Sequence, residues 1–99
     1  MYREIDTYNL IDIMDERTIN LIDIRESYKF AQGTIKTAKN IPVNFLLSSP
    51  DDYLNMDDEY YIFCNYGSTS RKVCEILTKK GYKVINVVGG YTNYLEDSK

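Results

Sequence analysis

The chain has 99 residues, of which 43% are hydrophobic and 27% are charged, and its net charge at pH 7 is −3. These values are typical of a single folded domain over residues 1–99, and they exclude an intrinsically disordered chain. The acidic balance disfavours nucleic acids and anionic membranes as partners, because both are bound through clustered lysine and arginine.

Neither a membrane span nor a secretion signal is predicted. No apolar run reaches the ~20 residues that cross a bilayer, and residues 1–6 lack the apolar stretch of a signal peptide. We therefore expect a cytoplasmic protein, in which thiols stay reduced. The sequence has no histidine and only two cysteines, Cys64 and Cys74, so neither a metal site nor a cofactor is predicted.

Short apolar segments predict the strands of a sheet. In chain order they cover residues 3–5, 19–24, 38–41, 60–63 and 84–88. Because helical segments alternate with them, we expect an α/β domain. Its central, mostly parallel sheet of about five strands should have helices on both faces.

Three helices are predicted between these strands. The first contains apolar residues 10–14 and is capped by Asp6 or Thr7. The second runs from Ser27, as its cap, to residue 32 and ends at Gly33. The third covers residues 69–80, with lysines in its last turn and a glycine directly after it.

The segment from residue 60 to residue 77 carries the chemistry. A strand ending at Cys64 leads through a short loop into a helix, and the loop residues are Asn65, Tyr66, Gly67, Ser68, Thr69, Ser70 and Arg71. Ligands of parallel sheets bind beyond the carboxyl ends of strands. Successive N–H groups at a helix N-terminus also form an anion-binding nest.

Cys64 is therefore expected to be partly thiolate and to act as a nucleophile without a histidine. The three hydroxyl residues 68–70 are expected to cap the helix or to donate hydrogen bonds to a bound anion. The alternative is that Cys64 is an unreactive buried residue, as free cysteines often are. The loop and the helix that follows it favour the reactive thiol.

Motifs in the same order along most of the chain resemble the rhodanese family. They are Leu-Ile-Asp-Ile-Arg-Glu at 21–26, Gly-Thr-Ile at 33–35, Ala-Lys-Asn-Ile-Pro at 38–42, Phe-Cys-x-x-Gly at 63–67 and Val-Gly-Gly-Tyr at 88–91. The resemblance implies a rhodanese-like fold and a sulfurtransferase that carries sulfane sulfur as a persulfide on Cys64. It also implies a small donor, such as thiosulfate, a persulfide or a polysulfide, and an acceptor that is cyanide or a thiol, including a protein thiol.

One loop position departs from the family's pattern. There the fifth residue after the cysteine is arginine and the sixth is serine, whereas this chain has Thr69, then Ser70, with Arg71 two positions late. Because arginine binds anions bidentately, we expect weak use of thiosulfate and a preference for a less charged persulfide or polysulfide.

The missing arginine leaves a second reading open, namely a catalytically weak or inactive module for interaction or sensing. A phosphatase or arsenate reductase on a related fold is disfavoured. Its arginine would stand six residues after the cysteine, where this chain has Ser70.

Three further residues have expected supporting or structural roles. Asp23 and Arg25 match the family's strand-end signature, and we expect an ion pair that is either purely structural or holds the loops around the site. Cys74 shares the apolar face of its predicted helix, which favours a core position over a second reactive thiol.

Overall fold

The computed structural model describes residues 2–99. The elements in chain order are β1 (Arg3–Asp6), α1 (Thr7–Glu16), β2 (Leu21–Asp23), α2 (Ser27–Gln32), β3 (Lys39–Asn40), α3 (Val43–Ser48), the 3-10 turn η1 (Pro50–Asp52), β4 (Glu59–Phe63), α4 (Ser68–Lys79), β5 (Lys83–Val88) and α5 (Gly90–Asp97). Within residues 2–99, no helix has the length and apolar character needed to cross a membrane.

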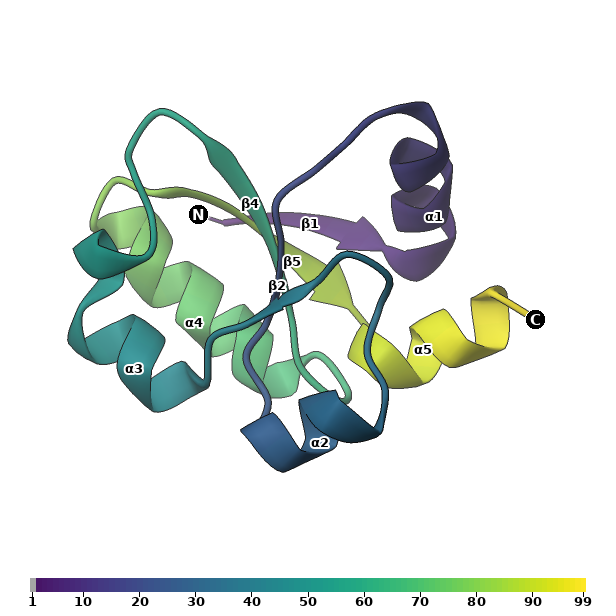
Figure 1. The fold of residues 1–99 in the computed structure, drawn as a ribbon. Helices are drawn as coiled ribbons and strands as arrows, with labels where there is room; N and C mark the ends of the chain where they lie inside the picture. Colours follow the sequence, from purple (N-terminus) through teal and green to yellow (C-terminus); the bar gives the residue numbers. More distant parts are fainter. Residues whose placement is uncertain (1) are drawn as a thin grey trace.

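The five strands form one sheet in the order β1-β5-β4-β2-β3, and all neighbouring strands are parallel (Figure 1). The two inner strands β4 and β5 are almost continuously buried, as expected where helices cover both faces of a parallel sheet. The edge strand β3 has only two residues. The predicted α/β class and five-stranded parallel sheet are confirmed.

Helices cover both faces of the sheet (Figure 1). On one face α3 and α4 pack against the sheet, and Leu77 of α4 belongs to the same buried cluster as Ile62 of β4. On the other face α1 packs with α5, and Leu10 of α1 shares a cluster with Phe63 of β4. Successive strand residues point to opposite faces, so β4 contributes to both halves of the core. It ends directly at Cys64.

Some predicted details differ from the structure. The segment 19–24 forms a strand only over Leu21–Asp23. Asp6 does cap α1, because its side chain accepts a hydrogen bond from the Asn9 N–H group. The predicted cap at Ser27 is wrong, since Ser27 is already helical and Glu26 precedes it without a side-chain capping bond. Helices α3 and α5 were not predicted.

Candidate functional site

Cys64 lies directly after β4, and its sulfur is surrounded by the backbone of the following loop. The N–H groups of Gly67 and Ser70 donate hydrogen bonds to Cys64 Sγ at 3.2 and 3.3 Å. Gly67 has φ +103°, and a Cβ atom there would lie 2.8 Å from the backbone nitrogen of Gly89. A residue with a side chain would therefore open the loop that aims both donors at the sulfur.

The first turn of α4 donates its hydrogen bonds differently from the prediction. The helix N-cap is Gly67, and it makes no side-chain capping bond, so none of Ser68, Thr69 and Ser70 is the cap. The Ser70 N–H group reaches the sulfur, while the Ser70 hydroxyl is fully buried and donates to Asn86 Oδ1 at 2.5 Å. The positive end of the α4 dipole is thereby directed at Cys64.

Helix α5 is attached to the backbone of the Cys64 loop. The Tyr91 N–H group donates to the carbonyl oxygen of Cys64 at 2.9 Å, and the Thr92 N–H group donates to that of Asn65 at 3.0 Å. A Cβ atom on Gly90 would lie 2.3 Å from the Cys64 carbonyl oxygen. Sequence reasoning missed this contact, although the Gly89-Gly90 pair was its visible signal.

The expected ion pair between Asp23 and Arg25 is present and buried. The Arg25 guanidinium donates to both carboxylate oxygens of Asp23, at 2.7 to 3.1 Å, and to the Gly33 carbonyl oxygen at 2.6 Å. It also contacts Asn65 Oδ1 at 3.5 Å and lies 4.4 Å from the ring centre of Tyr91. The pair thus connects β2, the Cys64 loop and α5.

A cavity of about 390 Å³ contains Cys64, and we call it the Cys64 cavity. Its lining residues are Ile24, Arg25, Glu26, Val43, Asn44, Cys64, Asn65, Tyr66, Ser68 and Thr69. Thr69 therefore lines the same cavity as the Cys64 sulfur. Arg71 lies outside this lining, on the exposed side of the first turn of α4.

The cavity has little net positive charge. Its charged lining groups are Arg25 and Glu26, and the charge of Arg25 is already balanced by Asp23. A second cavity, of about 460 Å³, shares Arg25, Asn65 and Tyr66 with it and also contains Tyr28, Tyr91 and Lys29. The Lys29 ammonium lies 3.6 Å from the Glu26 carboxylate, so this cation is paired as well. Tyr66 is 74% exposed. The entrance is therefore aromatic and close to neutral.

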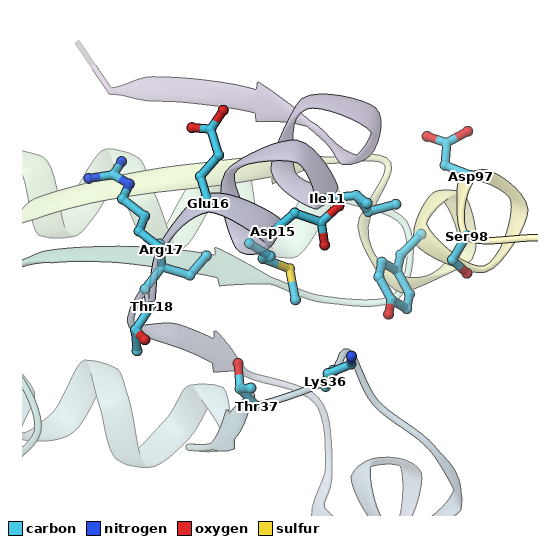
Figure 2. Close-up of a pocket in the computed structure, with 12 residues that line it drawn as sticks. Ile11, Asp15, Glu16, Arg17, Thr18, Lys36, Thr37, Asp97 and Ser98 are labelled. Atoms are coloured by element: carbon cyan, nitrogen blue, oxygen red, sulfur yellow. The ribbon is translucent and has the colours of Figure 1, made fainter.

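A third cavity, of about 550 Å³, lies apart from the cysteine loop (Figure 2). It is lined by the end of α1, the segment around Lys36 and the end of α5, and Figure 2 shows Asp15, Lys36 and Asp97 around it. No residue of the Cys64 loop lines it. Its size therefore does not make it the reaction site.

Cys74 has the predicted core position. Its side chain is 0% exposed on the inner face of α4. Burial, together with smaller contributions from Glu4 and Cys64, raises the pKa of the Cys74 thiol to about 12. Since the thiolate is the reactive form of cysteine, Cys74 is unsuited to react near neutral pH. Cys64 is also largely buried, at 7% exposed, but it lines a cavity.

Comparison with known proteins agrees with this geometry. The rhodanese-like domain family matches residues 6–97. A sulfurtransferase of Allochromatium vinosum is 32% identical over 92 residues, covering 91% of this chain and 85% of its own. YtwF of Bacillus subtilis, provisionally named a sulfurtransferase, is 32% identical over 98 residues, covering 98% of this chain and 94% of its own.

Solved structures give the same result. A rhodanese-like domain protein from Staphylococcus aureus superposes with a TM-score of 0.84 at 30% identity, covering 93% of this chain and 90% of its own. The chain belongs to the rhodanese-like domain family.

Proposed function

We propose that the protein is a sulfurtransferase that carries sulfane sulfur as a persulfide on Cys64. The observation that carries the proposal is the convergence of the Gly67 and Ser70 N–H groups on Cys64 Sγ, at 3.2 and 3.3 Å. These donors stabilise a thiolate before sulfur arrives. The relatives named as sulfurtransferases support the same chemistry.

The loading step is a displacement at sulfur. The Cys64 thiolate attacks the outer sulfur of the donor, a new S–S bond forms on Sγ, and the donor's own bond to that sulfur breaks. The electron pair leaves with the remainder of the donor, as sulfite from thiosulfate or as a thiolate from a persulfide. A cyanide or thiol acceptor then removes the outer sulfur and returns Cys64 to the thiolate.

The near-neutral entrance favours a weakly charged donor. Thiosulfate is a dianion, and its binding gains most from an unpaired arginine. In the Cys64 cavity Arg25 is paired with Asp23, and Thr69 supplies no charge. We therefore propose an organic persulfide, which carries at most one charge, as the preferred donor, with its organic part against Tyr66.

Intact mass spectrometry tests this function directly. The reduced protein is incubated separately with thiosulfate and with a small organic persulfide, and Cys64→Ser is the matched control. We expect a gain of one sulfur atom that is larger with the persulfide and absent from the variant. A gain that persists in Cys64→Ser would contradict the assignment. The absence of any gain would favour the binding-module reading that Thr69 left open.

A further inference from the structure

A line of hydrogen-bonded side chains connects an exposed edge of the sheet to the sulfur of Cys64. Cys64 Sγ lies 3.4 Å from Ser70 Oγ, and the Ser70 hydroxyl donates to Asn86 Oδ1 at 2.5 Å. Asn86 Nδ2 donates in turn to Glu4 Oε2 at 3.2 Å. Ser70 is 0% exposed and Asn86 is 2% exposed, whereas Glu4 is exposed.

Three elements bring these groups together. Asn86 on β5 and Glu4 on β1 are partners in the parallel register of the two strands. Asn86 lies two residues after Val84, so both side chains point to the face covered by α4. Ser70 projects from the first turn of α4 onto that face. A polar residue in the middle of a buried strand is costly unless it is hydrogen-bonded, and this line satisfies both ends of the Asn86 amide.

The line has a fixed direction. An ionised carboxylate only accepts hydrogen bonds, so Glu4 holds the Asn86 NH2 group toward itself and the Asn86 carbonyl oxygen toward Ser70. The Ser70 hydroxyl has one proton. Asn86 Oδ1 at 2.5 Å is a closer acceptor for it than the Gly67 carbonyl oxygen at 3.2 Å. Ser70 therefore presents an oxygen lone pair to the sulfur.

The orientation of the Ser70 hydroxyl has different effects on the thiol, the thiolate and the persulfide of Cys64. A protonated thiol can donate to the Ser70 oxygen, as the 3.4 Å contact allows, but a thiolate gains nothing from a lone pair. In a persulfide the negative charge lies on the outer sulfur and Sγ is uncharged. The oriented hydroxyl therefore disfavours charge on Sγ of the free protein without the same penalty in the loaded protein.

We propose that Asn86, oriented by Glu4, is a positioning residue that keeps the Ser70 hydroxyl from donating to Cys64 and so biases the site toward the sulfur-loaded state. An amide does not pass a proton without changing its tautomer, so the line orients a hydroxyl and is not a proton channel. The bias on loading rests on the proposed function. The effect on the free thiol does not.

Other charged and titratable groups also face this region. They are Tyr2 before β1, Asp23 at the end of β2, Arg25 and Glu26 after β2, Tyr66 in the loop, Arg71, Cys74 and Glu75 on α4, and Tyr91 on α5. Asp23 and Arg25 neutralise each other, and burial keeps Cys74 protonated. Alkylation of the folded protein therefore reports on Cys64 alone.

The pH dependence of alkylation by iodoacetamide, followed by intact mass, tests the proposal. Asn86→Leu removes the closer acceptor with little change of volume. The Ser70 proton is then left with the Gly67 carbonyl oxygen and the thiolate, and the charged acceptor binds it more strongly. We expect the midpoint of the rate profile to fall by about one pH unit, the shift that corresponds to one hydrogen bond to a charged group. An unchanged or higher midpoint overturns the proposal.

The Ser70→Ala background provides the specific control. If Asn86 acts through the Ser70 hydroxyl, Asn86→Leu should cause no further shift once that hydroxyl is absent. A shift that persists in Ser70→Ala shows that Asn86 acts by another route, and it overturns the proposal.

Glu4→Gln extends the test to an exposed position, where folding is not at risk. A glutamine can present either its oxygen or its NH2 group, so Asn86 is free to rotate. The midpoint should therefore fall, though by less than in Asn86→Leu. Glu75→Gln removes the same charge from the exposed side of α4, outside the line, and should leave the midpoint in place. Equal shifts in the two variants would assign the effect to charge alone and overturn the proposal.

Equilibration with a small persulfide donor gives the second measurement. The ratio of loaded to free protein should fall up to about tenfold in Asn86→Leu, the equivalent of one pH unit. A shifted alkylation midpoint in a protein that takes up no sulfur contradicts the proposed function and supports the role of Asn86. Normal loading with an unshifted midpoint overturns the role of Asn86 alone.

Discussion

The arginine that lines the Cys64 cavity is already paired with a carboxylate. Arg25 is the one cation that lines the Cys64 cavity within residues 2–99, and its guanidinium is bound to Asp23 and to the Gly33 carbonyl oxygen. Its direct contribution to binding an anionic substrate is therefore small, whereas its contribution to holding the loop is large. Thr69 is the position at which a free charge could be added.

Thr69→Arg should increase the use of thiosulfate. Thr69 is exposed and lines the Cys64 cavity, so an arginine there gains a partner in the dianion without burying its charge. We expect the rate of sulfur loading from thiosulfate to rise about tenfold, as one charge-assisted hydrogen bond allows.

The rate of loading from a small organic persulfide should change much less in the same variant. Intact mass time courses with each donor measure both rates, and Thr69→Gln, which adds length without charge, is the control. An equal gain in the two variants would show that charge is not the missing feature.

Sequence reasoning reached the residues of the site that are local in the chain. Cys64 and its loop follow one strand and precede one helix, and Asp23 and Arg25 are two residues apart, so their proximity needed no knowledge of the fold. Asn86 and Glu4 are 82 residues apart. Their contact depends on the register between β1 and β5, which the composition of the two short strands does not specify.

At the scale of the elements, α5 is part of the site through its backbone. It begins after Gly89 without a side-chain cap, and its first N–H groups are satisfied by the carbonyl oxygens of Cys64 and Asn65. These hydrogen bonds satisfy N–H groups at the start of α5 that have no partner within the helix, and they also fix the position of the cysteine loop. Helix α5 supports the cysteine loop from the side opposite α4.

Gly90→Ala should disturb both stability and the cysteine loop. Gly90 has φ +58°, and a Cβ atom there would lie 2.3 Å from the Cys64 carbonyl oxygen. We expect the free energy of unfolding in urea to fall by about 2 kcal/mol and the alkylation rate of Cys64 to change. Gly81→Ala is the matched control, because its φ is +100° but its Cβ would meet only Met56 Sδ at 3.4 Å. It should lose stability without changing Cys64 reactivity, and equal reactivity in all three proteins would contradict the role of α5.

There are physical reasons why two helices could not be predicted from the sequence. Helix α3 has six residues, too few for a helical period of apolar residues to appear. Helix α5 begins with glycine and contains few strong helix formers. It is stabilised instead by packing of Tyr91 and Tyr94 against the sheet. By contrast, α4 was predicted because its periodic apolar face and the glycine after its last turn indicate the same helix.

At the scale of the whole molecule, the burial of Cys74 makes the stability of the fold depend on pH in the alkaline range. Burial raises the pKa of this thiol to about 12 in the folded protein, against an ordinary value of 9.0, so only the unfolded chain ionises in the interval between them. The contribution of the Cys74 thiol to the free energy of unfolding is fully present below pH 9. It is lost as pH rises toward 12, by at most about 1.4 kcal/mol per pH unit.

Cys74→Val should make this loss shallower. Between about pH 8 and about pH 10.5, urea unfolding should show the wild type losing about 2 kcal/mol more than the variant. Tyrosine ionisation affects both proteins alike, so their difference isolates the thiol. Parallel stability curves would contradict the proposed contribution of Cys74.

The pairing of β1 with β5 joins the first strand of the chain to the last. During synthesis on the ribosome, β1 therefore emerges before its partner and remains an unpaired edge until β5 has been made. The cysteine loop likewise waits for the backbone of α5. The sheet and the sulfur site are completed together once β5 and α5 have emerged, and a nascent chain halted before β5 would expose both its edge and its thiol to other proteins.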